Sequence, residues 1–319
     1  MLSKTQIDQF WRDGCLVAPD AVTPAELAAM RAQIADWVEE SRGHRAPFGT
    51  PTLDGRPRFD MGEEHRPEKP ALRRINNPSD IAPAFADVAW NARVVDMIAD
   101  LIGPDVKFHH CKINLKLSGA KTEVSYHQDF AYTPHTNSDI VTALLFLDDI
   151  DESNGCLTVV PGSHKGPMLS LFDGERFTGA VAADAEAQAL AQSIPCLGKA
   201  GSVCLMHTKL LHGSAANRSD ASRGLYICVY TAADAVPIAR NPMPSLNEGR
   251  IVRGKEARVA RLKEGLIELP KQPSRSLQLI CNDCAAVIRF IVTLLEGSDD
   301  GCEGDFGKAL CRKAERRGA

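Results

Sequence analysis

Near the start of the chain, apolar residues recur at spacings of three and four, which predicts two amphipathic helices. The first follows Ser3 and ends at Gly14. The second begins at the sequence Thr-Pro-Ala-Glu (23–26), which places threonine at the N-cap, proline at the first helical position and glutamate for a capping box. It ends at Gly43, and we expect its apolar face to belong to the core. This face consists of Leu27, Met30, Ile34 and Trp37.

Beyond this helix the periodicity is lost over residues 43–80, which are rich in Pro, Gly, Arg and His. A long loop is predicted here, and either a binding loop or simple irregular packing would account for it. A further helix is predicted over 91–102, where Gly103-Pro104 ends it.

From residue 106 the pattern changes to short β-rich runs separated by turn residues, which indicates an antiparallel sandwich or barrel. A helical insertion over 177–192 and a charged helix over 254–269 are also predicted. We expect one domain over 1–319. It would have a β core at about 104–235, N-terminal helices in 1–103 and a C-terminal helical extension in 236–319. The expected strands are 106–117, 124–130, 140–147, 156–160, 203–206 and 225–230.

The composition is that of an ordinary globular protein, with 44% hydrophobic and 24% charged residues. The net charge of −4 gives no attraction for a polyanion, so nucleic acid is not expected as a partner. The first twenty residues lack a signal-peptide core. The apolar run 285–295 is far shorter than the roughly 20 residues that span a bilayer. We therefore expect a cytoplasmic protein without a membrane partner, acting on a small molecule.

Ten cysteines without a secretion signal indicate a reducing environment. The pair Cys281 and Cys284 resembles half of a zinc site, but no second C-x-x-C pair accompanies it. Six other cysteines are expected to be small buried residues with free thiols. They are Cys15, Cys111, Cys156, Cys196, Cys204 and Cys228.

His127 and Asp129 flank Gln128 within a predicted strand. Side chains at positions i and i+2 of a strand point to the same face, so this pair can supply two ligands to one metal ion. A plain His–Asp hydrogen bond on the face of a sheet is the alternative, because so short a motif also occurs by chance.

The downstream segment favours the metal site. His212 lies between the predicted strands 203–206 and 225–230, and Arg223 precedes the second of them. This order can place His212 and Arg223 on neighbouring strands facing the interior. Two histidines and a carboxylate with open positions form the facial triad of non-haem Fe(II) oxygenases. A buried arginine requires an anion, and a dicarboxylate cosubstrate fits its planar guanidinium.

With these residues the sequence resembles the phytanoyl-CoA dioxygenase (PhyH) family of Fe(II)/2-oxoglutarate-dependent oxygenases over about residues 1–235. The resemblance implies a mainly β fold, a double-stranded β-helix (jelly roll, cupin-like) with flanking helices. The shared motifs are His127-Gln-Asp129 with Ser138-Asp139, Asn154-Gly155-Cys156-Leu157, Pro161-Gly162-Ser163-His164-Lys165-Gly166, and His212-Gly-Ser214 with Asn217 and Arg223.

The resemblance also implies a site and an activity. Iron would be held by His127, Asp129 and His212. Arg223 and Ser214 would bind the distal carboxylate of 2-oxoglutarate. Asn114 and Lys116 would be further cosubstrate contacts, and a Lys116 that faces solvent is the alternative. With O₂, such an enzyme hydroxylates an unactivated C–H bond and releases succinate and CO₂. Because related halogenases replace the metal carboxylate by Gly or Ala, the presence of Asp129 favours hydroxylation.

The sequence indicates less about the identity of the substrate than about the metal site. The phytanoyl-CoA enzyme of the family carries a Trp late in the strand after Ser138-Asp139, where this chain reads Ala-Leu-Leu-Phe (143–146). An acyl-CoA substrate therefore does not follow from the resemblance. Arg73, Arg74 and Asn76 are candidate substrate residues for a small anion, although a solvated basic surface is equally consistent with them. A cupin-type metal enzyme without 2-oxoglutarate and a non-catalytic binding module remain alternatives.

Overall fold

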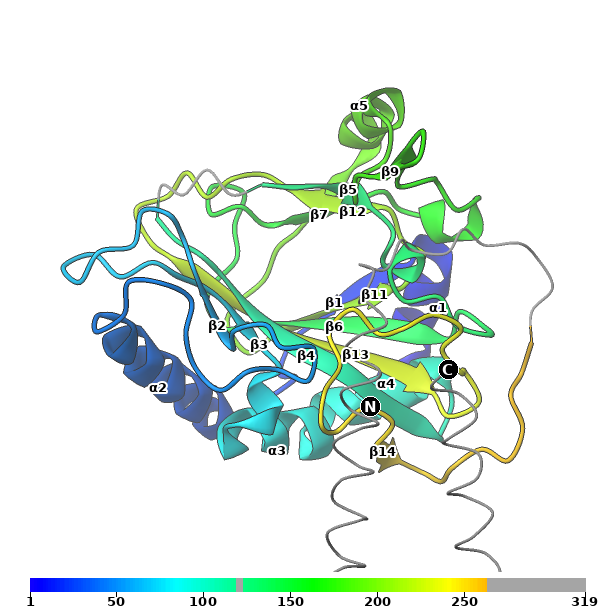
Figure 1. Cartoon of the computed structure of the whole chain (residues 1–319). Coiled ribbons are helices and arrows are strands. Elements are labelled where there is room, and N and C mark those ends of the chain that lie inside the picture. The colour runs from blue at the N-terminus through cyan, green and yellow to red at the C-terminus, as the bar shows by residue number, and fades with distance from the viewer. Residues whose placement is uncertain (119–122, 263–319) are drawn as a thin grey trace, which may run out of the picture. The chain divides into compact units, whose positions relative to one another are not determined.

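Two antiparallel sheets face one another in the computed structural model, which describes residues 1–118 and 123–262 (Figure 1). The larger sheet has the order β1 (Cys15–Ala18), β11 (Val203–His207), β6 (Ile140–Phe146), β13 (Arg223–Ala232), β4 (Val106–Lys116), β3 (Leu72–Asn76) and β2 (Phe59–Met61), and β14 (Ile251–Arg253) also pairs with β4. The smaller has the order β10 (Ile194–Cys196), β7 (Leu157–Val159), β12 (His212–Ser214) and β5 (Val124–His127). This is the predicted jelly roll.

Both N-terminal helices begin where the sequence places them. Ser3 and Thr23 each form a complete capping box, and Gly14 ends the first helix in the left-handed conformation that glycine favours. The second helix ends two residues before Gly43. The helices are α1 (Lys4–Asp13), α2 (Pro24–Ser41), α3 (Pro83–Asn91), α4 (Arg93–Ile102) and α5 (Ala183–Gln192), with short 3₁₀ turns η1 (Pro78–Asp80), η2 (Asp129–Ala131) and η3 (Ser163–Lys165).

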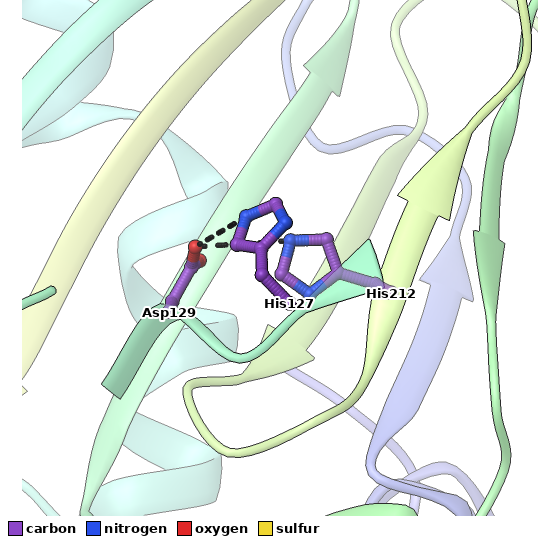
Figure 2. Close-up of side chains that lie close together, drawn as sticks. All are labelled: His127, Asp129 and His212. Carbon is purple, nitrogen blue, oxygen red and sulfur yellow. Dashed lines mark ion pairs between the residues drawn. The ribbon is translucent and has the colours of Figure 1, made fainter. Parts of the chain in front are cut away.

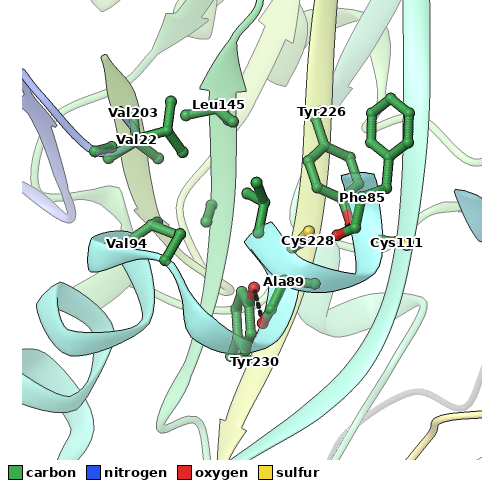
Figure 3. Packing of buried hydrophobic residues seen from close by; sticks show 14 of the residues in the cluster. Val22, Phe85, Ala89, Val94, Cys111, Leu145, Val203, Tyr226, Cys228 and Tyr230 are labelled. Carbon is green, nitrogen blue, oxygen red and sulfur yellow. Dashed lines mark hydrogen bonds between the residues drawn. The ribbon is translucent and has the colours of Figure 1, made fainter. Parts of the chain in front are cut away.

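The predicted helix over 91–102 corresponds to α4, whereas α3 was not predicted. The N-cap residue of α3, Ala82, makes no side-chain capping bond, so the usual start signal is weak. Packing on the large sheet holds this helix instead. Tyr226 and Tyr230 of β13 donate hydrogen bonds of 2.9 Å to the backbone carbonyls of Phe85 and Ala89 (Figure 3). Both tyrosines are fully buried.

The main core lies between helices α2 to α4 and the outer face of the large sheet (Figure 1). A second apolar cluster lies between the two sheets, with Leu144 and Met206 from the large sheet and Leu157 and Val159 from the small one. This cluster holds the two sheets together. Because it fills only part of the space between them, a cavity remains beside it.

Several predicted elements differ from the structure. Residues 43–80 are not simply a loop, because β2 and β3 extend the large sheet from this segment. These strands lie at the sheet's edge, and their charged residues obscure any alternation. The insertion 177–192 is helical only in α5, which follows the hairpin of β8 (Phe172–Asp173) and β9 (Arg176–Phe177).

The sheets also extend beyond the predicted core of 104–235, because β1, β2, β3 and β14 lie outside it. The predicted helix over 254–269 is wrong for residues 254–262, which form no helix. Residues 236–253 of the predicted C-terminal helical extension also form no helix and include β14. The rest of that extension, residues 263–319 with Cys281 and Cys284, lies outside the described residues. The single domain over 1–319 therefore stays a prediction.

The six other cysteines are free and buried, as predicted. None of the helices in the described ranges is both long and apolar enough to cross a bilayer.

Candidate active site

His127, Asp129 and His212 converge at the edge of the small sheet (Figure 2). His212 of β12 lies directly opposite His127 of β5 in the antiparallel register, and their ring centroids are 4.2 Å apart. The Oδ1 atom of Asp129 lies 3.5 Å from Nε2 of His127 and 3.7 Å from Nε2 of His212. All three potential ligand atoms lie within 4.8 Å of one another, which is close enough for one metal ion.

The route by which Asp129 reaches the site differs from the prediction. Strand β5 ends at His127, and Asp129 opens the 3₁₀ turn η2 rather than following at position i+2 of the same strand. Between them, the buried Gln128 faces away from the site. Its amide donates to the Lys209 carbonyl at 2.8 Å and accepts from the Leu169 backbone N–H at 2.8 Å. These bonds attach the turn to two other segments and orient the residues on either side.

Backbone and hydroxyl groups orient each candidate ligand. Nδ1 of His127 lies 2.8 Å from the Ser125 carbonyl, and Nδ1 of His212 lies 2.9 Å from the Leu210 carbonyl. Because a carbonyl can only accept, each Nδ1 carries a hydrogen, which leaves Nε2 as the ring atom that can bind a metal. Oδ2 of Asp129 accepts a 2.9 Å hydrogen bond from Thr142. Its Oδ1 thus remains available for a metal.

The electrostatics of the site suit metal binding. Burial and the neighbouring His127 lower the pKa of His212 to about 4, so its ring is neutral at physiological pH. Burial alone would raise the pKa of Asp129, but His212 and His127 hold it well below its usual range. The anionic carboxylate of Asp129 and the neutral imidazole of His212 can therefore ligate a divalent cation without first losing a proton.

Thr142→Val is expected to weaken binding of a divalent metal by about 10- to 100-fold, the usual cost of removing a partner that orients a ligand. The substitution keeps the side-chain shape and removes the bond to Asp129. Equilibrium titration with Fe(II) or Mn(II) measures the change. Thr208→Val is the matched control, because Thr208 also lines the cavity and its buried hydroxyl has no hydrogen-bond partner among the described residues. Equal losses in both variants would contradict the assignment.

A cavity of about 410 Å³ between the two sheets adjoins the three candidate ligands. Arg223, Lys116 and Ser214 line one part of it. Lys116 Nζ donates to Ser214 Oγ at 2.8 Å, and the register places Lys116 directly opposite Arg223. The prediction that His212 and Arg223 occupy neighbouring strands is wrong: β12 and β13 belong to different sheets, and both residues line the cavity between these sheets.

Arg223 is 3% exposed, and its guanidinium donates to the backbone carbonyls of Asn154 and Gly155. No carboxylate of the described residues forms an ion pair with it. Burial lowers the pKa of Arg223 to about 10, and burial together with nearby Arg223 lowers the pKa of Lys116 to about 8. Two buried cations facing one cavity are costly unless an anion binds between them, so this end suits a carboxylate.

Two of the motifs that the sequence shares with the PhyH family, Asn154-Gly155 and Asn217, position the residues at the Arg223 end of the cavity. At Gly155 φ is +73°, and an added Cβ would lie 2.8 Å from the Ala215 carbonyl, so only glycine fits there. Asn217 donates to the carbonyls of Lys116 and Ala221, at 3.0 and 2.8 Å. The Asn-Gly and Asn217 turns thus hold Lys116 and Arg223 in place.

The remaining predicted site residues divide into two groups. Asn114, Arg73 and Arg74 line the cavity, and Arg74 donates to Asn114 Oδ1 at 3.2 Å. Asn76 does not line it: its side chain is buried and donates to the Pro57 carbonyl.

Sequence reasoning missed two basic residues on the cavity wall, Lys112 and Arg56. The two-residue alternation on β4, which carries Lys112, Asn114 and Lys116 to one face, contained the signal for Lys112. Arg56 lies in an irregular segment and carried no such signal.

Comparisons with known proteins agree with this geometry. The family model described as Phytanoyl-CoA dioxygenase (PhyH) matches residues 10–225. A Stutzerimonas stutzeri protein, "Probable alpha-ketoglutarate-dependent hypophosphite dioxygenase", is 37% identical over 172 residues, which are 52% of this chain and 59% of that relative's length. A Caenorhabditis elegans "Probable phytanoyl-CoA dioxygenase" is 28% identical over 249 residues, 73% of this chain and 77% of the relative.

The fold also matches a solved structure. The crystal structure of EctD from S. alaskensis with bound Fe has a TM-score of 0.61 at 21% identity, covering 80% of this chain and 88% of that one. Since the family model matches more than half of the sequence, the chain belongs to the phytanoyl-CoA dioxygenase (PhyH) family.

Proposed function

We propose that this PhyH-family enzyme is an Fe(II)- and 2-oxoglutarate-dependent dioxygenase that hydroxylates an unactivated C–H bond of a small organic substrate. One observation supports it above all: two imidazole nitrogens and a carboxylate oxygen converge beside a cavity whose far end carries an arginine without a carboxylate partner among the described residues. This donor set leaves coordination positions open, as the facial triad requires.

In this proposal, His127, Asp129 and His212 hold the iron, and Arg223 binds the distal carboxylate of 2-oxoglutarate. Lys116 and Ser214 support Arg223 at the same end, and Asn114 contacts the cosubstrate. Bound Fe(II) with 2-oxoglutarate and O₂ supplies the oxidising chemistry, with succinate and CO₂ as co-products. The protein itself binds and orients the reactants in a cavity lined by apolar side chains from both sheets, such as Leu144 and Leu157, which limits the access of water.

The volume of the cavity limits the size of the substrate. A volume of about 410 Å³ lies near the lower end of the range for small-molecule pockets. With 2-oxoglutarate bound, it has room for a small second molecule. The relative that is 37% identical carries hypophosphite in its name, so oxidation of a P–H bond in a small phosphorus oxyanion is a second candidate reaction for this chain.

Anaerobic addition of Fe(II) and 2-oxoglutarate tests the proposal before any substrate is known. We expect the weak visible charge-transfer absorption of a 2-oxoglutarate–Fe(II) complex, and in air succinate formation that depends on both components. A screen of small acids, amino acids and phosphorus oxyanions, hypophosphite included, should then reveal compounds that stimulate succinate formation. Fe(II) binding without this absorption would favour a metal enzyme that does not use 2-oxoglutarate, and absence of metal binding would favour a non-catalytic module.

A further inference from the structure

Four arginine and lysine residues outside the Arg223 end also line the cavity, and they differ in their partners. Arg56 pairs with Asp54 at 2.6 Å, and Arg73 pairs with Asp60 at 2.5 Å, so both of these charges are neutralised within the protein. Arg74 donates a hydrogen bond to the neutral amide oxygen of Asn114, and Asp60 attracts its charge without forming an ion pair with it. The fourth is Lys112, and neither it nor Arg74 forms an ion pair with any carboxylate of the described residues.

Arg74 and Lys112 lie next to one another on adjacent strands. The register of β3 with β4 places Arg74 opposite Asn114, which is two positions from Lys112 on the same face. Burial of Lys112, and after it repulsion from Arg74, lower the pKa of Lys112, and the nearby carboxylate of Asp129 partly counteracts this. Lys112 is thus close enough to the candidate metal ligands for its charge to act on them.

This pair is separate from the pair at the other end of the cavity. Lys112 and Lys116 are four residues apart on β4, which at about 3.3 Å per residue places their backbones about 13 Å apart. In the proposed function, one carboxylate of 2-oxoglutarate binds Arg223 and the other end of the molecule faces the metal. No negative group of the cosubstrate is then left for Arg74 and Lys112.

We propose that Arg74 and Lys112 form a second anion subsite, which holds an oxyanion group of the substrate, a carboxylate or a phosphorus oxyanion, beside the metal centre. The planar guanidinium of Arg74 can bind two oxygens of such a group, and the Lys112 ammonium provides a point charge. The inference rests on the proposed function and specifies its substrate class: a small anion rather than a neutral molecule.

The test uses the full chain loaded anaerobically with Fe(II) and saturating 2-oxoglutarate. Sodium hypophosphite, methylphosphonate and acetate are titrated at constant ionic strength, with sodium chloride and neutral acetamide as references. Binding is followed by the shift of the visible absorption and by the rise in Tm. We expect at least one oxyanion to bind saturably while acetamide and chloride do not.

Substitutions distinguish the contribution of Arg74 and Lys112 to oxyanion binding from that of other basic residues. Lys112→Met and Arg74→Gln should each weaken the binding of that oxyanion at least tenfold, while the Kd of 2-oxoglutarate changes less than threefold, which also shows that the variants are folded. Lys107→Met is the matched control on the same strand, because Lys107 donates to the Ala235 carbonyl and does not line the cavity. It should leave oxyanion binding unchanged.

Three results would overturn the inference. One is that no oxyanion of the panel binds. Another is that the two variants weaken 2-oxoglutarate binding as much as oxyanion binding, which would assign the cations to the cosubstrate. The third is an equal effect of Lys107→Met. In each case the wild-type 2-oxoglutarate–Fe(II) absorption would persist, so the proposed function would stand; loss of that absorption in the wild type would remove both.

Discussion

Replacing His212 with alanine is expected to abolish 2-oxoglutarate turnover and to weaken Fe(II) binding by more than about 100-fold. Removing a group that merely orients a ligand typically costs about 10- to 100-fold in metal affinity, and His212 is itself a candidate ligand whose loss leaves only His127 and Asp129. His212 is 5% exposed, so removal of its ring leaves a space in the site rather than a change at the surface. Anaerobic Fe(II) titration and succinate formation measure the two effects.

The matched control for this variant is His44→Ala. The His44 ring stacks on Phe48, with centroids 3.8 Å apart, and does not line the cavity. We expect Fe(II) affinity and turnover close to those of the wild type. If His212→Ala bound Fe(II) as tightly as this control does, the assignment of His212 as a ligand would be wrong.

Arg223→Met is the second substitution with a large expected effect. It removes the buried charge proposed to pair with 2-oxoglutarate, and breaking a buried charge pair costs about 2–5 kcal/mol. At about 1.4 kcal/mol per tenfold change, the Kd of 2-oxoglutarate should rise at least about 30-fold. Fe(II) affinity should change little, because Arg223 makes its hydrogen bonds to Asn154 and Gly155 and none to the candidate ligands.

A titration of the visible absorption with 2-oxoglutarate measures this effect. Arg223→Lys should fall between the wild type and Arg223→Met, since it keeps the charge and loses the bidentate geometry. Arg250→Gln is the control: this guanidinium lies 4.0 Å over the Trp90 ring and outside the cavity. Unchanged 2-oxoglutarate affinity in Arg223→Met would favour a metal enzyme that does not use this cosubstrate.

Local sequence signals predicted the parts of the fold that depend on local interactions. The helices after Ser3 and Thr23 begin at their capping boxes because those hydrogen bonds form within four residues. The central strands were recognised because both faces of β6 and β13 are buried and read as continuous apolar runs.

Elements that depend on distant partners were missed. Helix α3 lacks a side-chain cap and is held by two tyrosine hydroxyls from β13, more than 100 residues away. Strand β3 carries Arg73 and Arg74, and only its pairing with β4 makes it a strand. Neither the tyrosine hydrogen bonds that hold α3 nor the pairing of β3 with β4 leaves a periodic pattern in the local sequence.

The same distinction applies to the site. The candidate ligands could be proposed because three residue types in order formed a recognisable set, although the turn that carries Asp129 could not be foreseen. The sequence alone did not show which basic residues pair with a carboxylate and which face the cavity. Arg58 is buried against Asp80 and Arg73 pairs with Asp60, whereas Arg74 faces the cavity without a carboxylate partner among the described residues. Only the folded chain distinguishes these three arginines.

A crystal structure of the anaerobic complex with Fe(II) and 2-oxoglutarate, with anomalous data collected at the iron edge, tests the central claim most directly. We predict one strong anomalous peak within bonding distance of Nε2 of His127, Oδ1 of Asp129 and Nε2 of His212, and 2-oxoglutarate density reaching from that peak to Arg223. An iron peak elsewhere in the chain, or cosubstrate density that does not approach Arg223, would contradict the account.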